Sequence, residues 1–196
     1  MARVAKHENA LVLAAAELFR KQGYAATGTA EILKRSGAPR GSLYHYFPGG
    51  KEEMAAAAIV AAGKVLSHTI GEIASNVNST AEFIEKYAQK LAGWMEKSDY
   101  RDGNPVTTVV LETVPQSELI TAEAEKAYEI WRDRIAELLA KDGWPDNRRA
   151  ATAELILASL DGALIGTRIK CDKSVIINIA SELARYLRLE NSARKP

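Results

Sequence analysis

The stretch from Thr27 to Lys51 decides the fold, and it reads TGTAEILKRSGAPRGSLYHYFPGGK. Its first part predicts a short helix that stops at Ser36-Gly37, because glycine readily adopts the left-handed backbone found just after helix ends. A second short helix is expected from Pro39 or Arg40 to Phe47, and Pro48-Gly49-Gly50 then breaks it. Two short helices joined by a tight turn form a helix-turn-helix pattern.

The second helix of this pattern has two different faces. Leu43, Tyr46 and Phe47 follow the i, i+3, i+4 spacing of one helical face, so they are expected to pack inward. An arginine, two aromatic rings that can form hydrogen bonds, and a glycine stand on the opposite side, which is unusual for a face that only meets water. These outward residues are Arg40, Gly41, Tyr44 and His45, with Ser42 at the edge.

This outward face suits a DNA groove. An arginine can bind O6 and N7 of guanine as a fork, so Arg40 is the candidate base reader. The hydroxyls of Ser42 and Tyr44 can bind phosphates, and Gly41 would let the backbone approach the DNA closely. Lys51 and the free N–H groups that open the next helix could hold a further phosphate. The pattern alone fits equally well a helical hairpin packed in an all-α core.

The run from Gly37 to Met54 resembles the signature of the TetR family of transcriptional repressors. Upstream, Ala16-Glu17-Leu18-Phe19, Gly23-Tyr24 and Thr27 resemble the first helix of that family and the entry to its second. The turn at residues 48–51 has one residue more than the commonest pattern, and this variant resembles the branch of lincomycin-resistance and flavonoid-responsive repressors. Shorter runs at 103–106 and 160–164 also resemble that branch.

The resemblance implies contacts to DNA, a two-fold symmetric homodimer, and a small-molecule effector that releases the DNA. Ala30 stands where many members have a basic residue, so base reading is expected to depend on Arg40 and the helix that follows. The DNA contacts implied by the resemblance are Thr27, Arg40, Gly41, Ser42, Tyr44, His45 and Lys51.

The rest of the chain predicts helices almost throughout. We expect an all-α fold of about nine helices, with a three-helix helix-turn-helix domain at residues 1–50 and a ligand-binding and dimerisation domain at residues 51–196. Thr27 or Thr29 is the expected N-cap of the second helix. The β-branched run 106–114 favours a strand, but no similar run could pair with it, so we expect a helix. Further helices are expected at about 7–22, from 51 and from 79 or 80 onward, and at 117–141, 146–170 and 172–189, with a fraying tail at 190–196.

Composition excludes several classes of protein. The net charge is only +1, but residues 1–51 carry eight Lys/Arg and three acids, so they hold +5 and the remainder −4. A single cysteine, Cys171, excludes a disulfide framework and a cysteine-based zinc site. No signal peptide and no uncharged apolar run near the ~20 residues of a membrane helix is found, so we expect a cytoplasmic protein with no membrane partner. Motifs of catalysis, cofactor binding and metal binding are absent, so we expect no enzyme, no cofactor and no metal.

Two helices near the C-terminus have the pattern of a dimer interface. The helix at 146–170 is apolar on more than one side and carries a row of small residues, which suits close contact with a partner helix. Two such helices from each subunit would form a four-helix interface, although both faces could also be buried within one subunit. The expected interface residues are Ser159, Gly162, Ala163, Gly166, Ile176, Ile179 and Leu183.

Large side chains elsewhere in the second domain are candidates for the wall of a ligand pocket. Residue by residue, an aromatic stripe is more often ordinary core, but an apolar cavity with a few polar groups is the usual ligand site. The expected pocket residues are Phe83, Tyr87, Leu91, Trp94, Tyr128 and Trp131.

The most consistent function is a ligand-responsive repressor that binds a palindromic operator as a homodimer and is released by a small, mostly hydrophobic effector. A dimer is also what DNA reading requires, because one short helix contacts too few bases to be selective. The alternative is an all-α small-molecule-binding protein or enzyme whose N-terminal helical hairpin is only structural. The exposed Arg40, Tyr44 and His45 face argues against that alternative.

Overall fold

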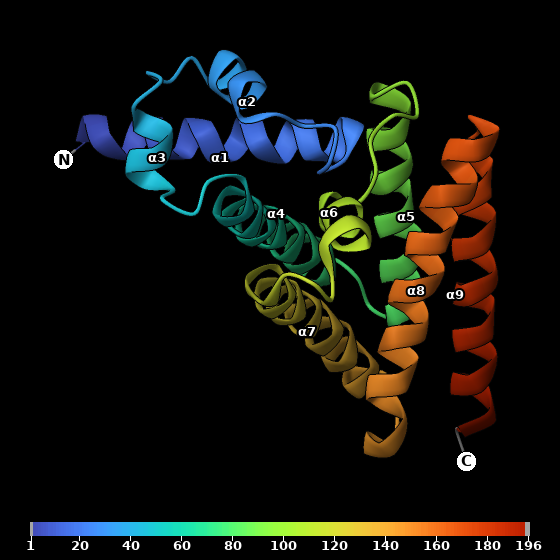
Figure 1. Cartoon of the computed structure of the whole chain (residues 1–196). Helices are drawn as coiled ribbons and strands as arrows, with labels where there is room; N and C mark the ends of the chain where they lie inside the picture. Colours follow the sequence, from blue (N-terminus) through green and yellow to red (C-terminus); the bar gives the residue numbers. More distant parts are fainter. Residues whose placement is uncertain (1, 195–196) are drawn as a thin grey trace. The chain divides into compact units, whose positions relative to one another are not determined.

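The computed structural model describes residues 2–194, with side chains from residue 7. Within this part of the chain there are nine helices and no strand, so the all-α prediction is confirmed (Figure 1). The helices are α1 (Ala2–Gln22), α2 (Thr29–Ser36), α3 (Ser42–Tyr46), α4 (Lys51–Ala74), α5 (Thr80–Lys97), α6 (Pro105–Thr113), α7 (Glu118–Lys141), α8 (Asp146–Lys170) and α9 (Ser174–Arg194).

Local sequence signals explain most helix boundaries. Ser79 caps α5, because its hydroxyl accepts the N–H of Glu82 at 3.2 Å. The ambiguous run 106–114 is helical, and its start is fixed by the Asn104 side chain, which accepts the N–H of Val106, and by proline in the first turn. The expected fraying after residue 189 is wrong up to Arg194, where α9 ends.

The polypeptide divides into two compact units. Unit 1 comprises the chain up to Val65 together with Gly103–Tyr128, and unit 2 comprises Leu66–Asp102 together with the chain from Glu129 onward. The division predicted from sequence, at residue 50, therefore differs from the division of the fold. Helix α6 and the first parts of α4 and α7 belong to the same unit as the helix-turn-helix.

Unit 1 is built around α1. Helices α2, α3 and α6 all pack against α1, as Figure 1 shows for α2 and α3. Leu11 and Phe19 of α1 are fully buried, as are Ile32 of α2 and Leu43 of α3. The helix-turn-helix is therefore fixed to α1 by one shared apolar core, which is the main source of its stability.

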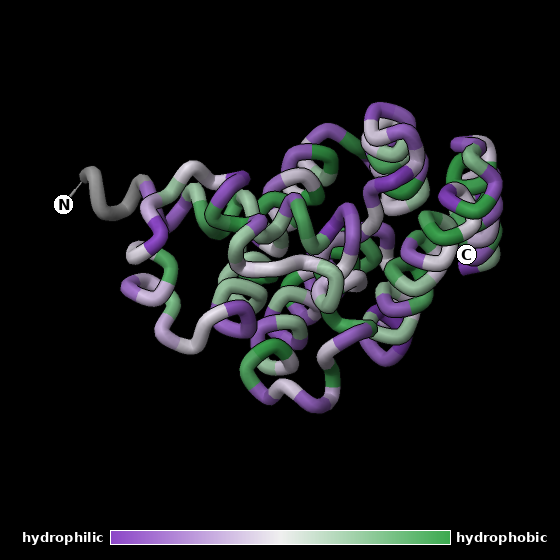
Figure 2. The backbone as a smooth tube through the Cα atoms, turned by 45° about the horizontal axis from the view of Figure 1, so that its top comes forward, coloured by the Kyte–Doolittle hydropathy of each residue, from purple (hydrophilic) through white to green (hydrophobic). Residues whose placement is uncertain are grey.

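Unit 2 has α9 lying along both α5 and α8. Figure 2 shows hydrophobic and hydrophilic residues interspersed along these helices, as amphipathic packing requires. The core contains Phe83 and Met95 of α5, Leu160 of α8 and Leu187 of α9, each at most 2% exposed.

Two helices, α4 and α8, are long and apolar enough to cross a membrane, judged by length and composition alone. In each case 44% of the apolar window is buried inside the structure. A core helix of a folded domain passes the same test, so this finding by itself is weak support for a membrane segment.

Candidate DNA-binding site

The turn of the helix-turn-helix has the conformation that its glycine predicts. Helix α2 ends at Ser36, and Gly37 follows with φ +65°, its N–H donated to the carbonyl of Leu33 at 3.1 Å. The N-cap of α2 is Gly28, and no side chain forms a capping hydrogen bond there. The expected cap at Thr27 or Thr29 is therefore wrong. The turn ends α2 abruptly, and the chain continues through it to α3.

Helix α3 separates its side chains as the spacing predicts. Leu43 and Phe47 are buried at 0% and 4% exposure, and Tyr46 is half-buried with its ring 4.8 Å from the ring of His45. On the other side Tyr44 is 64% exposed and His45 is exposed. The inward anchors thus leave a polar, aromatic face directed at solvent.

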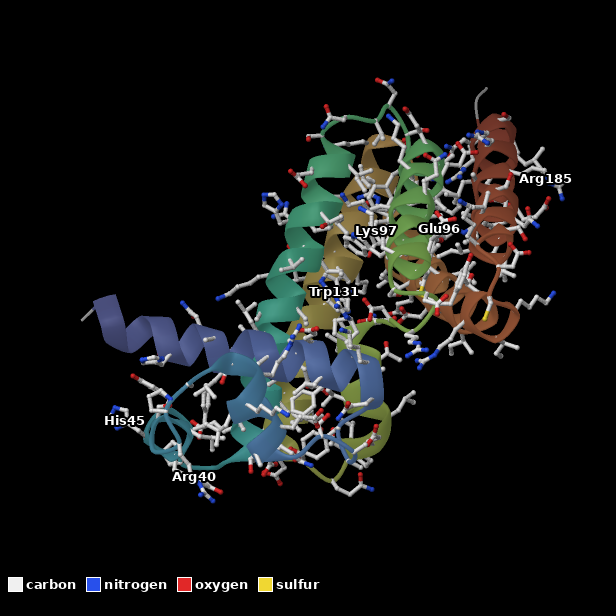
Figure 3. The ribbon with its side chains drawn as sticks, turned by 90° about the horizontal axis from the view of Figure 1, so that it is seen from above. Arg40, His45, Glu96, Lys97, Trp131 and Arg185 are labelled. Atoms are coloured by element: carbon white, nitrogen blue, oxygen red, sulfur yellow. The ribbon has the colours of Figure 1, made fainter. Side chains whose placement is uncertain are left out.

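Arg40 and Gly41 precede α3 instead of forming its first turn. The helix begins at Ser42, whose N–H and hydroxyl both donate to the carbonyl of Pro39, at 2.9 and 2.5 Å. Arg40 and Gly41 are exposed in this tight connection. In Figure 3, Arg40 and His45 lie at the same end of unit 1 and point away from the ribbon. We call Arg40, Gly41, Ser42, Tyr44 and His45 the recognition face.

Arg40 is a basic side chain of the recognition face without a counter-charge. No ion pair or hydrogen bond of its guanidinium is formed within residues 2–194. By contrast, Arg35 forms a two-pronged pair with Glu17, at 2.7 and 2.8 Å, and Lys21 binds the same carboxylate at 2.7 Å. Hydrogen bonds from Lys21 and Arg35 lower the pKa of Glu17. One of the positive charges counted from the sequence, that of Arg35, therefore ties α2 to α1 through Glu17.

Two residues implied as DNA contacts have structural partners instead. Thr27 is fully buried, and its hydroxyl donates to the carbonyl of Gly23 at 2.7 Å, so it is not available to a phosphate. Lys51 is half-buried, and its Nζ donates to the carbonyl of Tyr24 at 3.1 Å and lies 4.1 Å from the Tyr24 ring centroid. The Lys51 contact spans 27 residues of sequence, so no local pattern could have predicted it.

Helices α8 and α9 present an apolar groove of about 450 Å³. It is lined by Leu155, Ser159, Asn178, Ile179, Glu182, Leu183 and Tyr186. Three expected interface residues, Ser159, Ile179 and Leu183, lie in it, and sequence reasoning missed the others.

Three further residues of the expected interface face into unit 2 and need correction. Ala163 and Ile176 are 1% and 0% exposed, so neither is accessible to a second chain. A Cβ on Gly166 would lie 3.0 Å from the Val175 side chain, so that glycine serves close packing of α8 on α9. Gly162, however, is exposed, and a Cβ there would meet nothing within 4 Å.

The expected pocket residues are mostly packed side chains. The rings of Phe83 and Tyr87 stack at 5.5 Å, and Tyr87, Leu91 and Trp131 are buried. Burial, and secondly the nearby charge of Asp161, raise the pKa of the Tyr87 hydroxyl. Trp94 is half-buried in unit 2, whereas Tyr128 belongs to unit 1 and is 38% exposed. None of the six lines the α8–α9 groove.

A buried hydroxyl of unit 2 lacks a hydrogen-bond partner, and no metal site is found, among the residues that the structure describes. Thr167 is fully buried, and its hydroxyl has no hydrogen-bond partner within the described residues. The described residues contain no group of three or more His, Cys, Asp or Glu placed to hold a metal ion.

Fold and site together define a class, the helix-turn-helix transcriptional regulators. Residues 11–58 match the family described as bacterial regulatory proteins, tetR family, and residues 80–182 match the C-terminal domain of LmrA/YxaF-like transcriptional regulators. The chain therefore belongs to the TetR family of bacterial regulators, which confirms the resemblance noted from sequence.

Individual proteins agree with this assignment. The chain is 32% identical to the uncharacterized HTH-type transcriptional regulator YxaF of Bacillus subtilis, over 89% of this chain and 91% of that protein. It is 29% identical to the HTH-type transcriptional regulator LmrA of Bacillus subtilis, over 87% of this chain and 91% of that protein. The crystal structure of regulatory protein TetR from Rhodobacter sphaeroides superposes with a TM-score of 0.81 at 21% identity, over 90% of this chain and 96% of that chain.

Proposed function

We propose that this transcriptional regulator is a cytoplasmic repressor that binds a palindromic operator as a homodimer and is released by a small, mostly hydrophobic effector. The observation that carries the proposal is the recognition face, on which an uncompensated arginine stands beside exposed Tyr44 and His45. A guanidinium can bind both acceptors on the major-groove edge of guanine, and exposed hydroxyls can bind phosphates.

Support for a homodimer comes from the outer side of α8 and α9. Leu155, Ile165 and Ile169 of α8 are exposed apolar residues in the single chain, and Leu155 lines the apolar groove. A contiguous apolar surface that stays exposed in the single chain, as this groove does, often marks an interaction site. A second copy, with the same faces related by a two-fold axis, would cover it and would present two recognition faces to two half-sites.

Support for effector control comes from helices shared by the two units. Helix α4 begins in unit 1 and ends in unit 2, and α7 does the same. A ligand that binds unit 2 could therefore act on the helix-turn-helix through continuous helices. Such a ligand changes operator binding only by the difference in its affinity for the two states. Tyr87 and Thr167 offer buried hydroxyls in unit 2, and Asp161 lies close enough to Tyr87 to act on its charge.

The proposal is tested by an unbiased selection of bound DNA from a random library with the full-length chain. We expect a palindrome whose half-sites lie one or two helical turns apart. A library without enrichment would overturn the proposal in favour of the ligand-binding alternative. A palindrome would then serve as probe in a screen of small, mostly hydrophobic compounds for release.

The pocket is tested at Trp94, because this side chain is only half-buried. Truncating the buried Trp131 would cost about 3–5 kcal/mol of stability and would confound the result. We expect Trp94→Ala to lose release by a compound from the screen while operator affinity stays within about tenfold, ~1.4 kcal/mol. A variant that responds like the wild type would place the pocket elsewhere.

A further inference from the structure

The turn between α1 and α2 is held by two charged side chains from outside the helix-turn-helix. Glu112, at the end of α6, accepts the N–H of Tyr24 at 3.1 Å and the N–H of Ala25 at 2.6 Å, one on each carboxylate oxygen. Lys51, at the start of α4, binds the carbonyl and the ring of Tyr24 from its own side. We call Glu112 and Lys51, which together hold Tyr24 and Ala25, the turn clamp.

Gly23 makes room for this clamp. Its φ is +86°, and a Cβ at this position would lie 2.3 Å from Oε1 of Glu112. Glycine thus serves both the left-handed conformation and the close approach of the carboxylate. The clamped turn is also rigidly joined to the core, because the Tyr24 ring lies 5.5 Å from the fully buried Phe19 ring.

The turn clamp lies directly upstream of the DNA-reading elements. The carbonyl of Tyr24 also accepts the N–H of Thr27, and Gly28 then caps α2. A displacement of the turn therefore moves the start of α2, and α3 is packed on the same core. Hydrogen bonds between a carboxylate and backbone N–H groups are charge-assisted and directional, so they fix a turn more firmly than neutral hydrogen bonds would.

We propose that Glu112 is a positioning residue for DNA binding: its carboxylate fixes the α1–α2 turn to α6, and so sets the orientation of α2 and α3. It contacts no base or phosphate itself. The inference rests on the proposed DNA-binding function, since orientation matters only if the recognition face must meet a groove. It also assigns α6 a role in operator affinity that its sequence does not reveal.

The test compares Glu112→Gln with the wild type in the full-length chain. The amide keeps one acceptor oxygen but turns an NH₂ toward a backbone N–H, which breaks half of the clamp. Glu118→Gln is the matched control, because Glu118 is an exposed acid of the same unit with no bond to the turn. The first readout is the Kd for the DNA selected by the wild type, measured well below both melting temperatures.

We expect the Kd of Glu112→Gln to rise about tenfold, the active fraction titrated at high DNA concentration to stay unchanged, and the control to bind like the wild type. A variant that is merely less stable would show the opposite, a lower active fraction with an unchanged Kd. That result, or a Kd within twofold of the wild type, would overturn the inference.

Hydrogen exchange without DNA gives a second, independent readout. We expect Glu112→Gln to speed amide exchange at residues 23–25 and onward through α2 and α3, while α8 and α9 stay protected. Faster exchange confined to the turn, or no change, would overturn the positioning role. If the wild type selects no DNA, the proposed function fails, and the exchange experiment still decides whether Glu112 fixes these helices.

Discussion

Lys51 can be either a phosphate contact or a structural tether, and the two roles can be told apart by experiment. The family resemblance implies a phosphate contact, whereas the structure places its Nζ on the carbonyl and ring of Tyr24. We predict that Lys51→Met leaves the salt dependence of DNA binding unchanged. The reason is that the slope of log K against log salt counts phosphate contacts, and a tethered ammonium makes none.

The expected change in the salt dependence of binding separates the two roles clearly. Each lost phosphate contact lowers the slope by about 0.9, so a dimer that loses one per subunit would change by about 1.8. If the salt concentration changes fourfold, the ratio of wild-type to variant affinity then changes about twelvefold. The tether predicts no such change, but a loss of about 1–2 kcal/mol of stability from the missing hydrogen bond and cation–π contact. For a chain of this size that lowers the melting temperature by about 2–8 °C.

The assay is fluorescence anisotropy with the selected DNA between about 50 and 200 mM salt, a range wide enough to define the slope. It is paired with thermal unfolding of the free protein. Lys64→Met is the matched control, since Lys64 is an exposed lysine on the same helix without a partner in the described residues. A slope that falls by nearly two units in Lys51→Met, with unchanged melting, would refute the tether and restore the phosphate contact.

Three further outcomes follow from the same structure. Gly162→Leu should give folded monomers, because a Cβ there meets nothing in the single chain, and Gly71→Leu should remain dimeric; sedimentation decides between them. Gly23→Ala and Gly143→Ala should each lose about 1–2 kcal/mol from their left-handed φ, but only Gly23→Ala should weaken DNA binding, because only it displaces the turn clamp. The pKa of Glu17 is lowered in the folded state, so this carboxylate stabilises the fold at pH values above its ordinary pKa of 4.5. The stabilisation is lost as the pH falls through the lower pKa of the folded state. Glu17→Gln should therefore make the melting temperature depend less on pH over that acid range.

Local patterns predicted the architecture and the recognition face. Helical spacing placed Leu43 and Phe47 inside and Tyr44 outside, since a short helix on a core has one buried side. Gly37 likewise marked the C-terminal end of α2. These features depend on residues a few positions apart, which a single sequence displays directly.

Features that depend on distant contacts could not be predicted. The turn clamp joins Glu112 to a turn 87 and 88 residues away, and nothing near Glu112 signals that partner. Helix α8 is apolar on more than one side, so the sequence could not tell which row faces its own chain. The fold resolves this, because Ala163 is buried in the unit while Leu155 is exposed.

The central claim is that the recognition face reads bases, and the base preference of Arg40→Ala tests it most directly. The variant and the wild type are each given the same random DNA library, and the enriched sequences are compared position by position. We predict that preference is lost at one guanine in each half-site, at a cost of about 1–3 kcal/mol per lost contact, while the other positions keep theirs. An unchanged preference at every position would contradict the assignment of Arg40 as the base reader and, with it, the orientation of the recognition face.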